Sequence, residues 1–458
     1  MLDISDQQKQ DLILKYQRQV PRYTSYPTAP HFEQKFSVEI HKKWLADIRP
    51  DQEISLYIHV PFCEKMCWYC GCNTRVTKKY EPVKNYLNYL FKEIDNIKQL
   101  TNENILISQI HFGGGTPNIL LGEDFKKLIN YLKSKFRFTK DYTIDCEIDP
   151  RHLSQDQAIA FKETGVTRIS MGVQDFDLKT QNAINRVQPF ELVKEKLQML
   201  RDVGINSFNL DLIYGLPHQN LETMEDNIQK LKELNSERIS LFGYAHVPWM
   251  KKHMQLIPDE ILPDEKLRIK LYDLASKRLK DHGYNEVGID HFALAEDDLS
   301  EALNTKKLRR NFQGYVSDQA KTLIALGASS ISFFEGKGYI QNATCATSYK
   351  QAIEERNIPT LKGLEINQDD IIRSEIISEI MCHLEIDLDK IITKYSLPVD
   401  EFTSELENLK ELEQDKLIEI EAKKIKVNPN VRQIARIVAS YFDQYLNQQQ
   451  QTRHSTNT

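Results

Sequence analysis

Several features are missing from this sequence of 458 residues, and their absence limits where the protein works. No run of about 18 apolar residues is present, although a membrane-spanning helix needs one of that length. The first residues, MLDISDQQKQDLILKYQRQV, lack the charged and then apolar pattern of a signal peptide. We therefore expect a cytoplasmic protein that makes no membrane contact. In that reducing compartment, clustered cysteines are more often metal ligands or redox groups than disulfides.

An excess of basic residues is also missing, since the formal net charge is −6. Nucleic-acid binding needs a basic face, so the composition argues against a general nucleic-acid binder. It still allows an anionic small substrate at a local basic patch. Hydrophobic residues make up 40% of the chain, which supports a large core without disulfides, and the length suggests about three structural units.

What the sequence does contain is one alternation, repeated several times. Apolar stretches alternate with segments of helical periodicity such as YLNYLFKEIDNIKQL and FELVKEKLQMLRDVG. The apolar stretches lie near residues 55–60, 105–113, 143–149, 166–174, 205–214 and 238–246. Repeated strand and helix patterns of this kind predict a parallel sheet or barrel.

Each of these predicted strands has one polar face. In the first strand, for example, Leu56 and Ile58 alternate with Tyr57 and His59. Because strand side chains alternate between faces, the apolar face belongs under the helices and the polar face looks into a shared interior. A closed eight-stranded barrel has an apolar, filled interior instead. We therefore predict an α/β fold, an incomplete TIM-like (β/α)6 barrel with a wet lumen; a one-sided sheet that faces solvent is the alternative.

Beyond residue 246 the pattern loosens. It predicts a helix near 264–282, a strand in YNEVGID, a basic turn in LRRNFQGY and an apolar segment around 323–333. From about residue 361 the chain reads as mostly helical, with a hairpin in LIEIEAKKIKVN and a final helix in RQIARIVASYFDQYL. We expect an N-terminal arm (1–50), a barrel with its extension (51–360), a winged-helix-like C-terminal domain (361–446) and a disordered polar tail (447–458).

Four of the seven cysteines are concentrated in HVPFCEKMCWYCGCN, directly after the first predicted strand: Cys63, Cys67, Cys70 and Cys72. This is the carboxyl end of the strand, where βα barrels carry their active sites. A zinc ribbon needs two separated ligand pairs, and no second CxxC exists in the chain. A closed zinc site within the loop would need Cys70 and Cys72 to share a metal at very short spacing. A thioredoxin-like pair would leave the flanking cysteines unexplained. The other three cysteines are scattered and fit packing roles.

The CxxxCxxC spacing of Cys63, Cys67 and Cys70 is that of the radical S-adenosylmethionine superfamily. In that superfamily three thiolates hold three irons of a [4Fe-4S] cluster, and the fourth iron stays open for S-adenosylmethionine. We expect Cys72 to be a thiol beside the cluster, because a fourth thiolate would block the open iron. A ligand role for Cys72 remains the alternative.

Further motifs carry a closer resemblance. They are PRYTSYPTAPHF, YIHVPFCEKMCWYCGCN, HFGGGTPN, EIDPR, RISMGVQDF, NLDLIYGLP, YAHVP, RNFQGY and FDQYL. Over about residues 20–446 the chain resembles the oxygen-independent coproporphyrinogen III oxidase (dehydrogenase) family. The resemblance implies that the protein converts the ring A and B propionates of coproporphyrinogen III to vinyl groups, giving protoporphyrinogen IX in haem biosynthesis. The chain departs from the family's pattern at Ala320 and Lys321, where acidic or small residues are more usual.

Other functions remain open at this point. One is a different radical enzyme acting on tetrapyrroles, such as a methyltransferase or a haem ring-opening enzyme, or a haem chaperone. The N-terminal arm and the CGCN sequence speak against the chaperone. Besides the oxidase and these other tetrapyrrole proteins, a non-enzymatic iron–sulfur or zinc protein is also possible.

Candidate cofactor residues follow from strand faces and from the resemblance. Glycines such as Gly114 allow close approach of a ligand, or they form an empty turn. Polar-face residues such as Glu147 offer hydrogen bonds to a ligand or belong to an internal network. The resemblance implies sites for two S-adenosylmethionine molecules, the second contacting Tyr69, built from Tyr57, Tyr69, Gly113, Gly114, Gly115, Thr116, Glu147, Gln174, Arg186, Asp211, Ala245 and Ile331.

The four propionates of the implied substrate need basic anchors, for which Arg22, Arg309 and Arg310 are candidates. Each of these arginines is equally compatible with a solvated surface charge. The implied chemistry demands no general base, so we name no catalytic side chain. We also expect a flavodoxin- or ferredoxin-like electron donor, and a monomer, because no long heptad pattern is evident.

Overall fold

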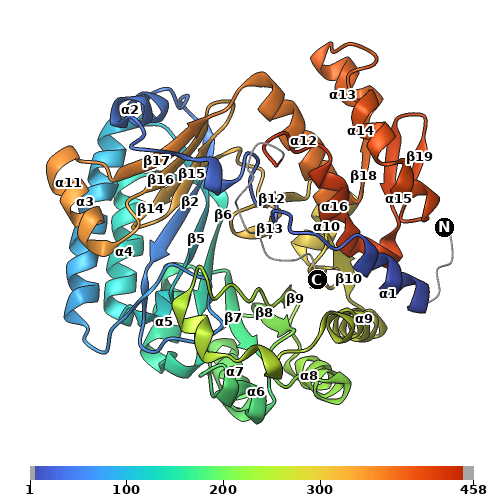
Figure 1. Cartoon of the computed structure of the whole chain (residues 1–458). Coiled ribbons are helices and arrows are strands. Elements are labelled where there is room, and N and C mark those ends of the chain that lie inside the picture. Colours follow the sequence, from blue (N-terminus) through green and yellow to red (C-terminus); the bar gives the residue numbers. More distant parts are fainter. Residues whose placement is uncertain (1–5, 447–458) are drawn as a thin grey trace.

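One twisted sheet organises the protein in the computed structural model, which describes residues 6–446 (Figure 1). The predicted disordered tail at 447–458 lies outside the described residues. The sheet has 13 strands in the order β1-β17-β16-β15-β14-β2-β5-β6-β7-β8-β9-β11-β10. Its two edges do not pair with each other, so the sheet forms an open barrel wall.

Six consecutive parallel strands make the centre of this wall, as the alternation predicts. They are β2 (Glu53–Val60), β5 (Leu106–Gly114), β6 (Arg137–Ile148), β7 (Arg168–Gln174), β8 (Ser207–Tyr214) and β9 (Arg238–Gly243). Each pairs in parallel with its neighbour in chain order. The predicted incomplete (β/α)6 barrel is therefore confirmed.

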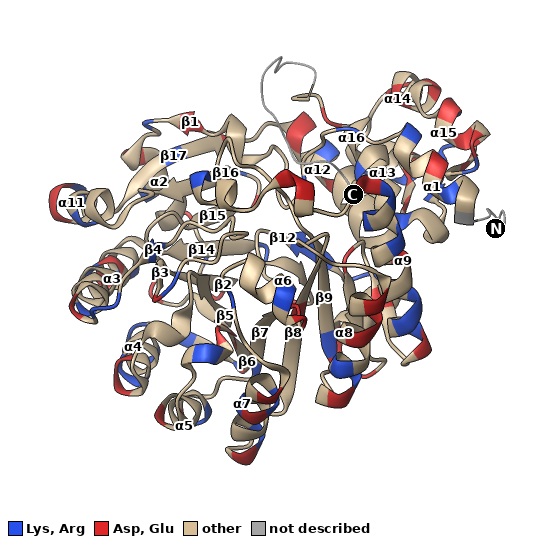
Figure 2. Cartoon of the chain, turned by 60° about the horizontal axis from the view of Figure 1, so that its bottom comes forward, with Lys and Arg blue, Asp and Glu red and all other residues tan. Residues whose placement is uncertain are grey.

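Helices cover the outer face of this wall, and they carry many of the charged positions coloured in Figure 2. They are α3 (Glu81–Leu100), α4 (Gly122–Lys135), α5 (Gln155–Thr164), α6 (Leu178–Ala183), α7 (Phe190–Asp202), α8 (Leu221–Leu234) and α9 (Glu265–Asp281). In α3 the buried residues Val83, Leu87, Leu90, Ile94 and Ile97 recur every three or four positions, which gives one apolar stripe. These stripes pack on the apolar strand faces to form the main hydrophobic core.

The polar strand faces are enclosed rather than open to solvent. Gln109 and Asn209 are only 9% and 8% exposed. Together with His111, Asp145 and Asp211 they line a cavity of about 130 Å³ inside the barrel. The alternative of a one-sided, solvent-facing sheet is therefore wrong. It fails because the barrel curvature and the extension beyond β9 cover this face.

Strands from other parts of the chain extend the wall on both sides. Next to β2 lie β14 (Thr322–Leu326), which is parallel to it, and then the antiparallel β15 (Ile331–Phe334), β16 (Gly338–Asn342), β17 (Thr360–Glu365) and β1 (Glu33–Gln34). Next to β9 lie β11 (His291–Ala293) and β10 (Asn285–Val287). Because β17 pairs with β16, we propose that the barrel extension ends after Glu365 rather than at residue 360.

Shorter elements connect these parts. They include α2 (Val38–Ala46), β3 (Phe62–Cys63), β4 (Arg75–Val76), α10 (Asp298–Asn304), β12 (Arg309–Asn311), β13 (Gly314–Val316), α11 (Ala346–Arg356) and the 3₁₀ turns η1 (Ala29–His31), η2 (Pro117–Ile119), η3 (Pro150–His152), η4 (Lys252–Leu256) and η5 (Asp259–Ile261). None of the described helices is long and apolar enough to cross a membrane.

The C-terminal part packs around a second hydrophobic core, which also includes residues of the N-terminal arm from Ile13 to Tyr26. In Figure 1, α1 (Asp6–Lys15) lies beside the C-terminal elements. The elements of this part are α12 (Gln368–His383), β18 (Glu385–Asp387), α13 (Leu388–Tyr395), α14 (Thr403–Asn408), α15 (Lys410–Gln414), β19 (Ile418–Glu421), β20 (Lys424–Val427), η6 (Pro429–Ile434) and α16 (Ala435–Ser440). The N-terminal α1, Tyr23 and Tyr26 join this core, so the arm is bound to the far end of the chain.

One prediction for this part is wrong in detail. The sequence predicts a single helix over RQIARIVASYFDQYL, whereas the structure has a 3₁₀ turn and then the short α16. The backbone of Val431 is non-helical, and Asp443 accepts hydrogen bonds from the backbone N–H groups of Tyr445 and Leu446. Such local side-chain bonds compete with helical pairing and end the helix early.

Candidate active site

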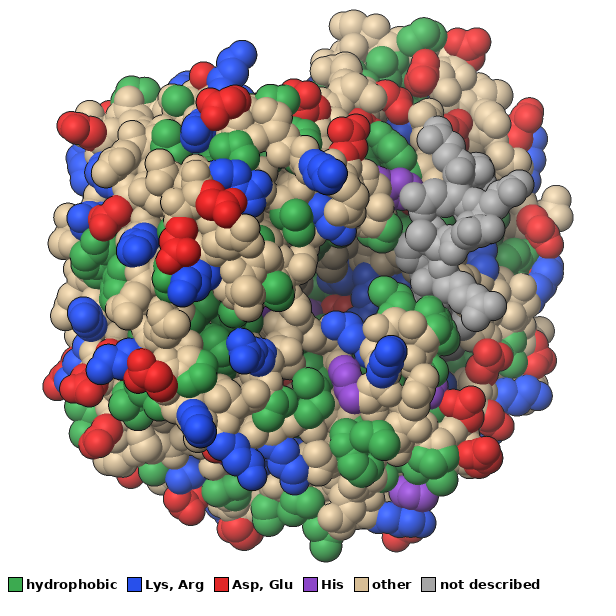
Figure 3. Space-filling model, turned by 60° about the vertical axis from the view of Figure 1, so that its left-hand side comes forward, with side chains coloured by type: hydrophobic (Ala, Val, Ile, Leu, Met, Phe, Trp, Pro, Cys, Tyr) green, Lys and Arg blue, Asp and Glu red, His purple; other side chains and the backbone are tan. Residues whose placement is uncertain are grey.

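Residues 61–77, which contain the four clustered cysteines and which we call the cysteine loop, lie at the carboxyl ends of the barrel strands. This loop begins after β2, and backbone hydrogen bonds tie it down, including those from Arg75 to the carbonyl of Pro61 and from Thr77 to that of Cys63. A cavity of about 440 Å³ opens beside it and is lined by Cys63, Cys67, Cys70 and Cys72, which we call the cysteine cavity. The space-filling view shows a hollow on one face of the molecule, with basic side chains in and beside it (Figure 3).

The three cysteines of the CxxxCxxC motif are free thiols, and each sulfur accepts a hydrogen bond. Cys63 Sγ accepts from the Thr74 hydroxyl at 3.3 Å, and Cys70 Sγ accepts from the Cys72 backbone N–H at 3.4 Å. Hydrogen bonding with Cys72 lowers the pKa of Cys70, whereas burial raises the pKa of Cys63 to about 11. Hydrogen bonds to sulfur stabilise thiolate ligands of iron–sulfur clusters, so the donor set fits such a cluster.

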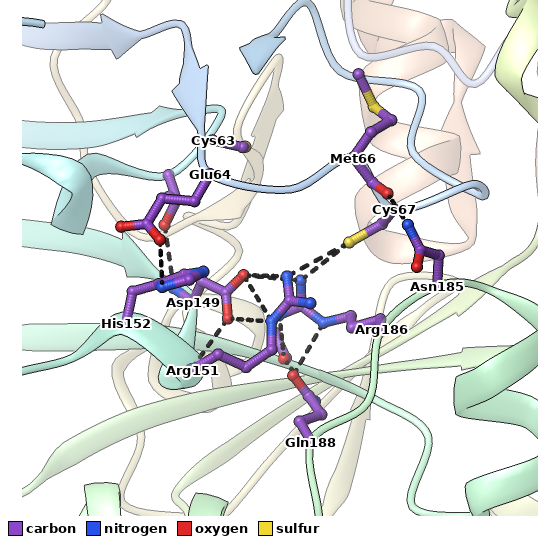
Figure 4. Close-up of polar contacts among 12 residues, drawn as sticks. Cys63, Glu64, Met66, Cys67, Asp149, Arg151, His152, Asn185, Arg186 and Gln188 are labelled. Atoms are coloured by element: carbon purple, nitrogen blue, oxygen red, sulfur yellow. Dashed lines mark hydrogen bonds and ion pairs between the residues drawn. The ribbon is translucent and has the colours of Figure 1, made fainter. Parts of the chain in front are cut away.

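Cys67 accepts from two arginines (Figure 4). Its Sγ lies 3.5 Å from Arg186 Nη1 and 3.6 Å from Arg151 Nη2. Asp149 lies between both guanidinium groups, 3.2 Å from Arg186 Nη1 and 2.5 Å from Arg151 Nη2. Burial opposes ionisation of Asp149, but the two arginines hold the pKa of its carboxyl well below the usual range. Gln188 then accepts from Arg186 Nε at 2.9 Å and fixes the orientation of that guanidinium.

A single metal ion fits this loop poorly. Within residues 6–446, no group of three Cys, His, Asp or Glu side chains is placed to hold one ion. A [4Fe-4S] cluster spreads its protein ligands over several irons, so it does not require the three sulfurs to converge on a point.

The triple-glycine stretch brings the end of β5 against the cysteine loop. A Cβ on Gly115 would lie 2.4 Å from the Phe62 carbonyl oxygen, and Gly114 has a φ of +122°. The backbone N–H of Gly115 donates to Val60 and that of Thr116 donates to Phe62. The glycines are therefore needed for two backbone segments to meet, whether or not a ligand is bound.

Most predicted cofactor residues do line the cysteine cavity: Tyr69, Gly114, Gly115, Thr116, Glu147, Gln174, Arg186, Asp211 and Ala245. Three do not lie on its wall. Tyr57 donates or accepts a hydrogen bond with His59 Nδ1 at 3.1 Å and stacks on His111, while Gly113 and Ile331 belong to β5 and β15.

Two carboxylates, Glu147 and Asp211, line both the cysteine cavity and the cavity inside the barrel. Glu147 Oε1 lies 3.1 Å from His111 Nε2, and Asp211 Oδ1 accepts from Asn209 at 2.8 Å. Burial, followed by the nearby Glu147, raises the pKa of Asp211 to about 7. A neutral Asp211 can donate a hydrogen bond as well as accept one, so this wall suits a polar ligand such as a ribose.

The candidate substrate arginines lie in different surroundings. Arg22 lines the cysteine cavity, and its Nη2 donates to the Gly243 carbonyl at 3.2 Å. Arg310 lies in an adjoining pocket with Arg22. Arg309 Nη1 donates to the backbone carbonyls of Asp318 and Ala320. The unusual Ala320 is thus an acceptor for Arg309 through its backbone, a contact that does not depend on its side chain.

Sequence reasoning missed several residues of this site. Asp149 and Arg151 stand in the EIDPR motif, yet nothing in that motif indicates a contact with a cysteine 84 residues away. His253 Nε2 lies 2.8 Å from the Cys70 carbonyl oxygen, and Lys251 Nζ donates to that of Cys72 at 3.2 Å. A loop that shows no clear periodicity supplies both, so no sequence signal was available to find them.

Comparisons with known proteins agree with this geometry. The model of the Radical SAM superfamily matches residues 57–231. The chain is 38% identical over 431 residues to coproporphyrinogen III oxidase, anaerobic 1, of Cereibacter sphaeroides, covering 94% of this chain and 95% of that protein. It is 39% identical over 430 residues to the oxygen-independent coproporphyrinogen III oxidase of Paracoccus denitrificans, with the same coverage of 94% and 95%.

A solved structure matches the fold over nearly its whole length. It is coproporphyrinogen III oxidase (HemN) from Escherichia coli, described as a radical SAM enzyme, with a TM-score of 0.88 and 34% identity. The match covers 93% of this chain and 100% of that one. The chain therefore belongs to the oxygen-independent coproporphyrinogen III oxidase family of the radical SAM superfamily.

Proposed function

We propose that the protein converts coproporphyrinogen III to protoporphyrinogen IX without oxygen, as a step of haem biosynthesis. Each of the ring A and B propionates loses one hydrogen atom to a 5′-deoxyadenosyl radical, then carbon dioxide and one electron, which passes to an external one-electron acceptor, and becomes a vinyl group. The observation that carries the proposal is the shared cavity: in a chain of this family, Cys63, Cys67 and Cys70 open onto the same space as Arg22. The three cysteines suit an iron–sulfur cluster, and Arg22 suits an anion.

The family implies a [4Fe-4S] cluster and S-adenosylmethionine, and the residues present fit both. Cys63, Cys67 and Cys70 would hold the cluster, with Cys72 beside it as a non-ligand thiol. When bound, this pair supplies a 5′-deoxyadenosyl radical that removes a hydrogen atom from the propionate β-carbon. No general base is required, so the protein positions and shields the reactants.

We propose that two S-adenosylmethionine molecules bind in the cysteine cavity. Arg186 is suited to a carboxylate, Glu147 and Asp211 to ribose hydroxyls, and Tyr69 contacts the second molecule. Gly113, Gly114, Gly115, Thr116, Gln174 and Ala245 would shape the rest of the two sites, with Tyr57 and Ile331 acting from behind the cavity wall. When both molecules fill the cavity they would exclude water, which would otherwise react with radical intermediates.

We propose that the substrate binds through ion pairs between its four propionates and arginine side chains. Arg22 is the proposed first anchor because it lines the cysteine cavity, and Arg310 is a second. Arg309 is a third proposed anchor, although one of its nitrogens is already used by backbone carbonyls. We also propose a flavodoxin- or ferredoxin-like electron donor, a monomeric state and a cytoplasmic location.

A product assay tests the proposed function. The cluster is reconstituted without oxygen, dithionite, S-adenosylmethionine and coproporphyrinogen III are added, and the tetrapyrroles are analysed by mass spectrometry. The expected result is the loss of two carboxyl groups together with formation of 5′-deoxyadenosine. Methyl transfer to the tetrapyrrole, or tight haem binding without turnover, would instead support the other functions that the sequence leaves open.

A further inference from the structure

A second, smaller pocket adjoins the cysteine cavity. Its charged residues are Arg22, Asp290, Arg310 and Arg436, and we call it the arginine pocket. It shares Arg22 and the segment 242–245 with the cysteine cavity, so the two spaces meet at the end of β9. A group bound in one therefore lies next to a group bound in the other.

The arginine pocket carries an excess of positive charge. Three guanidinium groups face one carboxylate, Asp290, whose Oδ1 is also 2.7 Å from His291 Nδ1. The side chain of Arg310 is 5% exposed, and its guanidinium stacks on the Tyr315 ring. Among the described residues, Arg310 forms one ion pair, with Asp290 at 3.7 Å. Within residues 6–446, Arg310 Nε and Nη1 have no hydrogen-bond partner, and neither does Gln433 Oε1 on the same wall. Burying an incompletely paired cation is costly, so the pocket is organised for an anion.

Arg436 lies near two other positive charges. Burial, followed by the nearness of Arg22 and Arg310, lowers the pKa of Arg436 to about 10. An arginine ordinarily stays charged far above that range. An anion bound among the three guanidinium groups would relieve this repulsion.

Segments that are far apart in the sequence build the pocket. Arg436 in α16 donates to the carbonyl oxygens of Val20 at 2.6 Å and Pro21 at 3.2 Å, and Arg310 Nη2 lies 3.5 Å from that of Arg22. The C-terminal core thus places the arm backbone immediately before Arg22. Arg22 then reaches the Gly243 carbonyl at the cavity rim.

The size of the pocket limits what it can hold. Its volume is about 50 Å³. A single water needs about 10–15 Å³ on this measure, so the pocket has room for roughly four waters. That space fits one carboxylate group, and the macrocycle of a tetrapyrrole must remain in the larger cysteine cavity.

We propose that the arginine pocket binds the carboxylate of a propionate that the reaction leaves intact, on ring C or D. This inference rests on the proposed function. Decarboxylation turns a charged carboxylate into neutral carbon dioxide, and ion pairing with several guanidinium groups stabilises the charged ground state. A carboxylate in this pocket is therefore protected from loss, while it holds the reacting propionate in the neighbouring cavity.

Two substrates test the proposal in one experiment. The first is coproporphyrinogen III, and the second is an analogue with ethyl groups in place of the ring C and D propionates. With the first, Arg310→Gln is expected to raise KM about 30-fold, since truncating one partner of a buried charge pair is costly. With the analogue, the wild-type KM is already raised and Arg310→Gln changes it less than about threefold.

The matched control is Arg432→Gln. Arg432 is a buried arginine of η6, close to Arg436 in sequence, but its Nη2 pairs with Glu286 at 3.0 Å. Arg432→Gln is expected to lower the stability of the protein and to change KM by the same factor for both substrates. If Arg310→Gln does not fold, Arg310→Lys, which keeps the charge and loses the planar fork, is compared in the same way.

An equal rise of KM for both substrates, or no rise with coproporphyrinogen III, would overturn the proposal. These results differ from a failure of the proposed function. In that case the wild-type protein would not convert coproporphyrinogen III at all, although its cluster and its cleavage of S-adenosylmethionine were intact.

Discussion

Arg186 Nη1 lies 3.5 Å from Cys67 Sγ, although the two residues are 119 positions apart in the chain. Arg151 Nη2 approaches the same sulfur at 3.6 Å, and Asp149 holds both guanidinium groups in place. Of the three motif cysteines, Cys67 is the one in direct contact with positive charge. Positive charge is therefore concentrated beside one of the three motif cysteines, and its effect on the cluster can be measured as a redox potential.

The first prediction concerns the cluster potential. Arg151→Gln removes a positive charge and a hydrogen bond from Cys67, and Arg186 still pairs with Asp149. Positive charge near a cluster stabilises its reduced form, so the midpoint potential is expected to fall by tens of millivolts, where roughly 59 mV is a tenfold change for one electron. A redox titration followed by electron paramagnetic resonance measures it.

Arg137→Gln is the control for this titration. Arg137 begins β6, at the opposite end of the strand, and its Nη1 pairs with Asp51 at 3.2 Å. The potential of this variant is expected to match the wild type. An unchanged potential in Arg151→Gln would show that the contact with Cys67 is lost when the cluster is bound.

The second prediction separates ligands from neighbours among the thiols. Alanine at Cys63, Cys67 or Cys70 is expected to reduce iron bound after anaerobic reconstitution to below about half of the wild type, because each removes one of three thiolate ligands. Alanine at Cys72 is expected to leave the iron content near the wild-type value. Iron analysis and visible absorbance give the result.

An exposed thiol outside the loop, Cys345, provides the control as Cys345→Ala. Loss of the cluster in Cys72→Ala, with Cys345→Ala unaffected, would assign Cys72 as a ligand after all.

The third prediction tests the close approach of two backbone segments. Gly115→Ala would place a Cβ 2.4 Å from the Phe62 carbonyl oxygen, so the cysteine loop must move. Overpacking of this kind costs about 1–3 kcal/mol, and we expect lower thermal stability together with weaker iron binding. Gly71→Ala lies in the loop itself, and its Cβ would have no atom within 4 Å. The account fails here if both glycine variants bind iron equally well.

The fourth prediction concerns a buried acid away from the cavity. Glu93 in α3 is 1% exposed, and it accepts hydrogen bonds from Tyr349, Asn342 and the backbone of Gly327. Burial raises the pKa of Glu93 to about 7 from an ordinary value of 4.5. Because the folded pKa is the higher one, its contribution to stability is fully present below about pH 4.5 and is lost as the pH rises through 7.

The size of this loss follows from the shift. It amounts to about 3 kcal/mol between pH 4.5 and pH 8, at 1.36 kcal/mol for each pKa unit. Urea unfolding of the cluster-free protein at several pH values measures it, with Glu93→Gln as the comparison. The difference in free energy of unfolding between the two proteins should change in favour of Glu93→Gln as the pH rises, and a constant difference would contradict the assignment.

The sequence predicts the barrel and the cysteine loop well because both have local signals. Alternating polar and apolar residues define the six strands, and the cysteine spacing is contained within ten residues. The arginine pocket has no such signal. Arg22, Arg310 and Arg436 come from the arm, the extension and the C-terminal core, and only tertiary packing brings them together.

Tertiary packing also sets the contacts of other predicted site residues. The polar face of β2 predicts that Tyr57 reaches a ligand, and this stays a prediction; in the structure its hydroxyl lies 3.1 Å from His59 Nδ1, and its ring stacks on His111. Arg309 and Arg310 are adjacent in sequence and alternate along β12, so their guanidinium groups reach different partners.

The central claim is that a radical formed at the cysteine cavity acts on the β-carbon of a propionate. The most direct test is to give the reconstituted enzyme coproporphyrinogen III deuterated at the propionate β-carbons, with S-adenosylmethionine and reductant, and to analyse the 5′-deoxyadenosine by mass spectrometry. The account predicts that deuterium appears in 5′-deoxyadenosine as vinyl groups form. Vinyl products accompanied by unlabelled 5′-deoxyadenosine, or labelled substrate left unchanged while S-adenosylmethionine is cleaved, would contradict it.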